Sequence, residues 1–199
     1  MKKVLLIASI LFVAVVSTAC INNLAVQDLN NKAKAYADKG DYTQAIERLK
    51  SSIDLDPSVF ETHYNLAVVY TQAEDYVNAV EEYKKVIEMK PEAADSYYSL
   101  ATAENNLAVD MEQGTVRMQT DGTLYTPKAD EISSQDDYEL SDDAKQYISE
   151  LYEASIANYE KYLELAPNAE DKASVQEQIQ KIKDHQSGSD KQIGAIPEE

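Results

Sequence analysis

Residues 26–93 read VQDLNNKAKAYADKGDYTQAIERLKSSIDLDPSV and then FETHYNLAVVYTQAEDYVNAVEEYKKVIEMKPEA, two consecutive blocks of 34 residues. The blocks share a tyrosine, an alanine and a proline at the same places, namely Tyr36 and Tyr70, Ala45 and Ala79, and Pro57 and Pro91. A fixed period of this length is typical of stacked helical repeats, in which each unit buries its apolar face only against its neighbours. Such arrays present an extended surface of helices to other molecules.

Within this frame the chain resembles the tetratricopeptide repeat family, whose pattern places large, small and aromatic residues at fixed positions and a proline near the end of each unit. Residues 26–59 supply Leu29, Ala33, Tyr36, Gly40, Ala45, Leu49 and Pro57, and residues 60–93 supply Leu66, Ala67, Tyr70, Ala79, Tyr83 and Pro91. Lys32 replaces a leucine of the pattern, and Ser52 and Val86 each replace an alanine. The resemblance implies an all-α solenoid of about three helix pairs, closed by a C-terminal capping helix.

Local chemistry agrees with these units. Pro57 and Pro91 end the second helix of each pair, because proline cannot continue helical hydrogen bonding. Asp41 and Asp75 are expected to cap the N-termini of the second helices. The stretch 58–61, Ser-Val-Phe-Glu, predicts a capping box at the start of the second repeat, residues 60–93.

A third unit, residues 94–167, starts on schedule and is then interrupted. Tyr97 and Leu100 fit the pattern, but Glu104 stands where the family has a tyrosine. The closing proline is Pro167, 42 residues later than the position 125 at which a regular array would place it. We therefore expect a large insertion at about 110–140 inside the third repeat.

The insertion and the segments after it carry their own signals. Asp121-Gly122 between partly apolar arms indicates a β-hairpin. Helical spacing of apolar residues predicts a long helix over roughly 141–165, with Ser141 as its N-cap. An amphipathic pattern predicts a capping helix over 168–185, and the composition of 186–199 predicts a disordered tail.

The first twenty residues have the order of an export signal. Lys2 and Lys3 are followed by an unbroken apolar or small run from Val4 to Val16. The run is shorter than the ~20 apolar residues of a membrane-spanning helix. Its length instead suits the apolar core of a signal peptide.

Residues 18–20, Thr-Ala-Cys, resemble the end of a bacterial lipoprotein signal, whose cysteine carries a diacylglyceryl group as a thioether. The resemblance implies that residues 1–19 are cleaved, that Cys20 is lipidated and that 20–25 form a tether. Ser17 departs from the leucine that the family prefers. An ordinary cleaved signal and an uncleaved anchor are the alternatives.

Composition excludes several classes of partner and chemistry. The formal net charge of −18 becomes −20 once Lys2 and Lys3 are removed, which argues against nucleic acid and anionic lipid as partners. Because Cys20 is the only cysteine, no disulfide framework is expected. No catalytic motif, cofactor loop or calcium loop is found, so we expect no enzyme activity, cofactor or metal site.

The remaining candidate site is the face that the family forms from the first helix of each repeat. The resemblance implies partner contacts from Asn30, Lys34, Tyr64, Asn65, Val68, Tyr98, Thr102 and Asn105. Tyr64 and Tyr98, one repeat apart, are expected to stack on a ligand chain. The alternative is partial burial of both tyrosines against the inserted segment. The basic residues with which some members clamp a C-terminal carboxylate are absent, since Asn30, Asp95 and Ser99 occupy those places.

The sequence thus predicts a lipid-anchored scaffold that binds a protein or peptide at the bacterial cell envelope and assists assembly there. Ile21 replaces the aspartate that resembles an inner-membrane retention signal. An outer-membrane anchor facing the periplasm is therefore expected in a cell with two membranes, and the outer face of the cell membrane in a cell with one. The alternative is a self-assembling structural protein whose groove is filled by its own insertion. The partner and the oligomeric state are left open.

Overall fold

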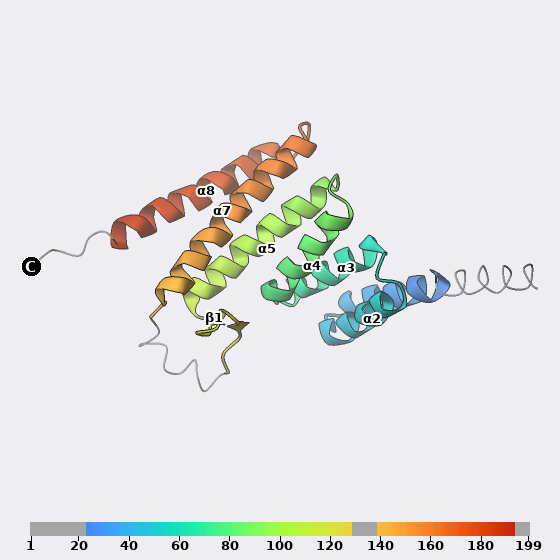
Figure 1. The fold of residues 1–199 in the computed structure, drawn as a ribbon. Helices are drawn as coiled ribbons and strands as arrows, with labels where there is room; N and C mark the ends of the chain where they lie inside the picture. Colours follow the sequence, from blue (N-terminus) through green and yellow to red (C-terminus); the bar gives the residue numbers. More distant parts are fainter. Residues whose placement is uncertain (1–22, 129–138, 194–199) are drawn as a thin grey trace, which may run out of the picture. The chain divides into compact units, whose positions relative to one another are not determined.

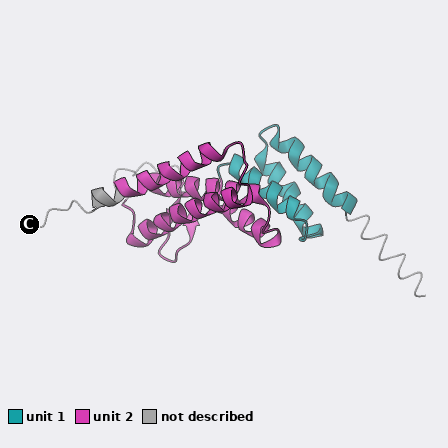
Figure 2. Cartoon of the chain, turned by 90° about the horizontal axis from the view of Figure 1, so that it is seen from above, with its two compact units in different colours: residues 1–74 teal, residues 75–199 magenta. Residues whose placement is uncertain are grey.

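The computed structural model describes residues 23–128 and 139–193 and is almost entirely helical (Figure 1). The elements in chain order are a first helix over 23–37, α2 (Tyr42–Leu55), α3 (Phe60–Gln72), α4 (Tyr76–Met89), α5 (Ala94–Gln113), β1 (Arg117–Met118), β2 (Leu124–Tyr125), α7 (Asp142–Leu165) and α8 (Lys172–Ile193). Helices that follow one another in the chain pack together within each of two compact units, Met1–Glu74 and Asp75–Glu199 (Figure 2). This arrangement confirms the predicted all-α helical-repeat solenoid.

Small side chains let the helices of the first unit approach closely. Ala33, Ala45 and Ala67 are at most 1% exposed. Leu49 and Leu66 fill the space beside them and are likewise 1% exposed. Burial of each such leucine contributes roughly 2 kcal/mol to stability, so the core of this unit comes from the residues that define the repeat.

The side chain at the fourth place of a repeat bonds to the proline that closes the preceding repeat. In the first unit, Nε2 of His63 lies 3.2 Å from the carbonyl oxygen of Pro57. In the second unit, the hydroxyl of Tyr97 donates to the carbonyl oxygen of Pro91 at 3.1 Å. His63 is 7% exposed, and with this contact to Pro57 it has a structural role.

The predicted N-caps are confirmed. Side-chain oxygens of Asp41, Asp75 and Ser141 each accept a hydrogen bond from the backbone N–H three residues further on, at 3.1, 3.3 and 3.2 Å. Each bond satisfies a donor that the first turn of a helix leaves unpaired.

The predicted capping box over 58–61 is wrong. Val59 occupies the N-cap position of α3, without a side-chain hydrogen bond. Ser58 turns back instead, and its hydroxyl and backbone N–H donate to the carboxylate of Asp56 at 2.6 and 3.0 Å. Ser58 lies one residue too early to cap the helix, and the carboxylate of Asp56 is a strong acceptor for both of its donors.

The insertion lengthens both helices of the third repeat. α5 has 20 residues and α7 has 24, against 13 and 14 in α3 and α4. α5 packs along α7, and the buried hydroxyl of Ser155 donates to the carbonyl oxygen of Ala101 at 2.7 Å. The predicted helix over 141–165 is confirmed. Residues 110–113, assigned to the insertion, belong to α5, which ends at Gly114 in a left-handed conformation (φ 73°).

The predicted hairpin is confirmed as a two-stranded antiparallel pair. Met118 lies opposite Leu124, and the intervening turn contains Gly122 with a φ of 84°. The carboxylate of Asp121 accepts a hydrogen bond from the backbone N–H of Thr123 at 2.9 Å. The rest of the insertion, 129–138, lies outside the described residues.

The C-terminal helix is longer than predicted. α8 packs on α7 and buries Val175, Ile179 and Ile182, and nearly all its other side chains over 172–188 are exposed, as a capping helix requires. It begins four residues later than expected, and it continues to Ile193, so the predicted disorder of 186–193 is wrong. An unbroken helix propagates at little cost beyond a packed segment, which composition alone does not indicate. Residues 194–199 lie outside the described residues.

The predicted signal peptide, Cys20 and the first part of the tether lie outside the described residues. Residues 23–25 are already helical, so the tether prediction is wrong at these positions, where the first repeat helix extends beyond the repeat frame. Among the described residues, no helix combines the length and the apolar character needed to span a bilayer.

Glu104, which replaces the tyrosine of the repeat pattern, is 1% exposed between α5 and α7. Its carboxyl accepts a hydrogen bond from Nδ2 of Asn158 at 2.7 Å. Burial disfavours the charged form and raises the pKa of Glu104 to about 7, although this hydrogen bond and the charge of Lys84 act in the opposite direction. The folded protein therefore binds a proton here over a pH range in which the unfolded chain does not.

We predict that the third repeat loses stability as pH rises. Because the pKa of Glu104 is higher in the folded state, its favourable contribution is complete below about pH 4.5 and is lost as pH rises to about 7, a total of roughly 3 kcal/mol. Glu104→Gln should remove this dependence and be more stable than the original chain at pH 8. Hydrogen exchange of α5 and α7 at pH 5 and pH 8, corrected for the intrinsic rates, measures both effects.

Glu92→Gln, at an exposed position, is the matched control and should leave the pH dependence unchanged. The same pH dependence in Glu104→Gln as in the original chain would show that another group is responsible.

Candidate functional site

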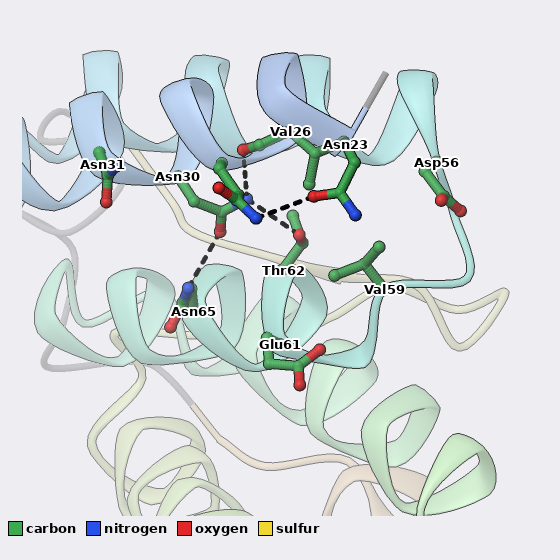
Figure 3. A pocket seen from close by; sticks show the side chains of 10 residues that line it. Asn23, Val26, Asn30, Asn31, Asp56, Val59, Glu61, Thr62 and Asn65 are labelled. Atoms are coloured by element: carbon green, nitrogen blue, oxygen red, sulfur yellow. Dashed lines mark hydrogen bonds between the residues drawn. The ribbon is translucent and has the colours of Figure 1, made fainter. Parts of the chain in front are cut away.

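A polar pocket of about 450 Å³ lies in the first unit, between the first helix (23–37) and the start of α3 (Figure 3). Its lining consists mainly of amide and carboxylate side chains, from Asn23, Val26, Gln27, Asn30, Asn31, Asp56, Val59, Glu61, Thr62 and Asn65. A pocket of this size is within the range of ligand sites in proteins. Two of the predicted partner-binding residues, Asn30 and Asn65, take part in it.

Asn30 joins three helices at this pocket. Its side-chain amide donates to the carbonyl oxygen of Val26 at 2.9 Å and also lies 2.9 Å from the hydroxyl of Ser52 and 3.0 Å from that of Thr62. Ser52 belongs to α2 and Thr62 to α3, and both are 0% exposed. Buried hydroxyls need such partners, because an unpaired one costs roughly 1–3 kcal/mol.

The orientation of two amides follows from the Val26 carbonyl. Since a carbonyl oxygen only accepts, the group of Asn30 that faces it is the NH₂ group. The Oδ1 atom of Asn30 then accepts from Nδ2 of Asn65 at 3.0 Å (Figure 3). Asn30 is thereby occupied within the protein, whereas Asn65 keeps its own oxygen as an acceptor.

Asp56 and Glu61 are the charged residues that line the pocket. The two hydrogen bonds from Ser58 hold the pKa of the Asp56 carboxyl below its usual value, so this group is anionic at neutral pH. Gln27, one turn below Asn31 on the first helix, donates its amide to Oδ1 of Asn23 at 2.8 Å. The pocket is therefore negative and rich in amides.

The other predicted residues of the first unit do not line this pocket. Lys34 forms an exposed ion pair at 3.1 Å with Asp38, which directly follows the end of the first helix. Tyr64 and Val68 lie on α3 and are each partly buried. Both residues follow Thr62 on α3, but neither lines the pocket. Their role as partner contacts stays a prediction.

In the second unit, Tyr98 and Thr102 pack on α7. The ring of Tyr98 makes edge contacts with Tyr159 and Tyr162 at centroid distances of 5.5 and 5.4 Å, and remains 38% exposed. Thr102 shares a hydrogen bond of 2.9 Å with the hydroxyl of Tyr159. Tyr98 is thus held by the returning helix of the third repeat, while 38% of the residue stays exposed. Asn105 Nδ2 lies 3.5 Å from Oδ1 of the adjacent Asn106.

The sequence did not indicate the hydroxyl pair that Asn30 bonds. Ser52 gave a signal, because a serine replaces the alanine of the pattern. Thr62 gave none, and the partner of its hydroxyl, Asn30, lies 32 residues away in the chain.

The described part of the chain contains no candidate metal-binding site. Within residues 23–128 and 139–193, no three side chains of histidine, cysteine, aspartate or glutamate lie close enough together to hold an ion.

Comparisons with known proteins agree with this fold. A model described as "TPR repeat" matches residues 33–73, and a model described as "Tetratricopeptide repeat" matches 60–93. Among curated proteins, none matches the sequence.

Solved tetratricopeptide domains are similar in structure but not in sequence. The first domain of Spaghetti (RPAP3), bound to the HSP90 peptide SRMEEVD, is 16% identical with a TM-score of 0.56, over 82% of this chain and 94% of that one. The second domain of human RPAP3, in complex with the HSP70 peptide SGPTIEEVD, is 14% identical with a TM-score of 0.55, over 81% and 98%. The Arabidopsis OM64 domain is 13% identical with a TM-score of 0.55, over 80% and 98%. At these identities the likeness establishes the fold alone.

We predict that Asn30→Ala destabilises the first unit by roughly 2 kcal/mol, because it leaves two buried hydroxyls without their partner. Hydrogen exchange of the first helix and α3 should then speed up about thirtyfold. Asn31→Ala is the matched control: it removes the same side chain from an exposed neighbouring position and should change stability by less than about 0.5 kcal/mol. Equal effects of the two substitutions would contradict the role of Asn30.

Proposed function

We propose that this chain, whose residues 33–93 are tetratricopeptide repeats, is a scaffold that binds a protein or peptide partner on the first helices of its repeats. The observation that carries the proposal is the amide-lined pocket between the first helix and α3. Packing of the helices does not require an open polar pocket at this place. A concave pocket with polar groups is what a ligand site requires. The fold itself is that of interaction scaffolds.

The pocket suits an extended polypeptide. A peptide backbone offers one donor and one acceptor per residue, and side-chain amides can bond to both. Asn31 and Asn65 project such groups from the two helices on either side of the pocket (Figure 3). The RPAP3 domains that share this fold bind short peptides of HSP90 and HSP70, which supports a peptide-sized ligand here.

The scaffold is proposed to act at a bacterial cell envelope, held there by lipid on Cys20. Support comes from the sequence: a short apolar run ends in Thr18-Ala19-Cys20. Each buried methylene of an acyl chain contributes roughly 0.8 kcal/mol, so two or more chains give durable anchoring. An anchored scaffold places its partner at the membrane surface and favours assembly of a complex there.

Crosslinking in living cells tests partner binding. A photoreactive residue in place of Asn31 or Tyr64 should form adducts with a second protein, because both positions belong to the proposed binding face. The same residue in place of Asp54, exposed on α2, is the control and should form few or none. Adducts only between copies of this chain would favour the self-assembling alternative. No adduct from the binding face would refute the scaffold.

The anchor is tested by Cys20→Ala. This variant should incorporate no lipid analogue and should leave the membrane fraction, since no other cysteine is present to take the acyl group. Ser17→Leu restores the residue that the lipoprotein pattern prefers and should label at least as well as the original chain. Labelling that persists in Cys20→Ala would exclude the proposed attachment site.

A further inference from the structure

We infer that the pocket between the first helix and α3 selects a partner segment with a positively charged side chain, a lysine or an arginine. The inference rests on the proposed function, because it specifies which partner the scaffold holds. It follows from the hydrogen-bonding capacity that the pocket leaves unused and from the charges that line it.

The pocket uses part of its donors internally. The NH₂ group of Asn30 is taken by Val26, Ser52 and Thr62, and one N–H of Asn65 is taken by Asn30. One N–H of Gln27 is taken by Asn23. The donors left over are the second N–H of Asn65 and of Gln27 and the amides of Asn23 and Asn31.

Acceptors are left in excess. Within the described residues, no hydrogen bond reaches Oδ1 of Asn65, Oε1 of Gln27 or the carboxylate of Glu61. Asp56 adds a second carboxylate, with one oxygen bonded to Ser58. A lysine ammonium offers three donors and an arginine guanidinium five, and neither group accepts. Their chemistry therefore complements the pocket.

The charges act in the same direction. Among the ten lining residues, two are acidic and none is basic. The lysines on the first helix are held in ion pairs of their own, Lys32 with Asp28 and Lys34 with Asp38. The chain as a whole carries a formal net charge of −18, which accelerates encounter with a basic partner.

The same features disfavour the peptides bound by the similar domains. The HSP90 and HSP70 peptides in those structures end in Glu-Glu-Val-Asp. Such a terminus brings several carboxylates to its site. Here they would meet Asp56 and Glu61 and a set of acceptors, so repulsion and unpaired groups would oppose binding. Shared fold and opposite charge preference are compatible, because the fold does not determine the ligand.

The test combines crosslinking with charge removal in the full-length chain. A photoreactive residue replaces Asn31, and the crosslinked partner segment is sequenced by mass spectrometry. Asp56→Asn and Glu61→Gln then remove each charge with little change of shape, and asparagine can still bond Ser58. Asp54→Asn, exposed on α2 outside the pocket, removes the same charge as a control.

We expect the crosslinked segment to contain a lysine or arginine next to the attachment site. Each pocket variant should reduce adduct yield about threefold and Asp54→Asn should not, and the yield in isolated membranes should fall as salt rises. Replacing the partner's basic residue with methionine should cancel any further effect of Glu61→Gln.

Two results would overturn the inference and leave the scaffold standing: a crosslinked segment without a basic residue, or an adduct yield unaffected by both pocket variants. Absence of adducts at both Asn31 and Tyr64 would instead remove the proposed function, and the inference with it.

Discussion

A backbone carbonyl can only accept a hydrogen bond, and in the first unit the carbonyl of Val26 accepts one from the side chain of Asn30. This bond turns the amide so that its NH₂ group also meets the hydroxyls of α2 and α3, and its oxygen meets Asn65. Sliding the first helix or α3 by one turn would break at least two of these bonds, and sliding α2 would break the one to the buried Ser52. The network therefore fixes the register of three helices, and it also determines which groups of the pocket are left for a ligand.

Much of the fold could be predicted because its signals are local. Aspartates cap the helices that follow them, Pro57 and Pro91 end helices, and the 34-residue period positions each pair. The predictions that were wrong concern segments where interactions beyond the local pattern decide the structure. Ser58 bonds Asp56 rather than the helix, and α8 continues through a segment whose composition favours disorder. In the first case the neighbouring carboxylate of Asp56 competes for Ser58. In the second case the packed part of α8 supports the continuation of the helix.

The candidate site was predictable only in outline. The resemblance assigned Asn30 and Asn65 to the binding face, and the structure places both at a pocket, but it uses one amide to bind the other. That outcome depends on Ser52 and Thr62, which lie 22 and 32 residues from Asn30. Similarly, Tyr98 packs on α7 because the insertion still returns the second helix of the third repeat to its usual partner. No pattern within one repeat contains these contacts.

The insertion between α5 and α7 also affects the order in which the parts of the protein fold. Contacts of Asn30 span at most 35 residues, whereas those between α5 and α7, such as Ser155 with Ala101 and Thr102 with Tyr159, span 54 and 57. A chain that emerges N-terminus first can complete its first unit early, because loop closure over short distances is fast. The apolar face of α5 must wait for α7. Until then it is exposed to other chains, and the third repeat is the part of the molecule where a chaperone would act.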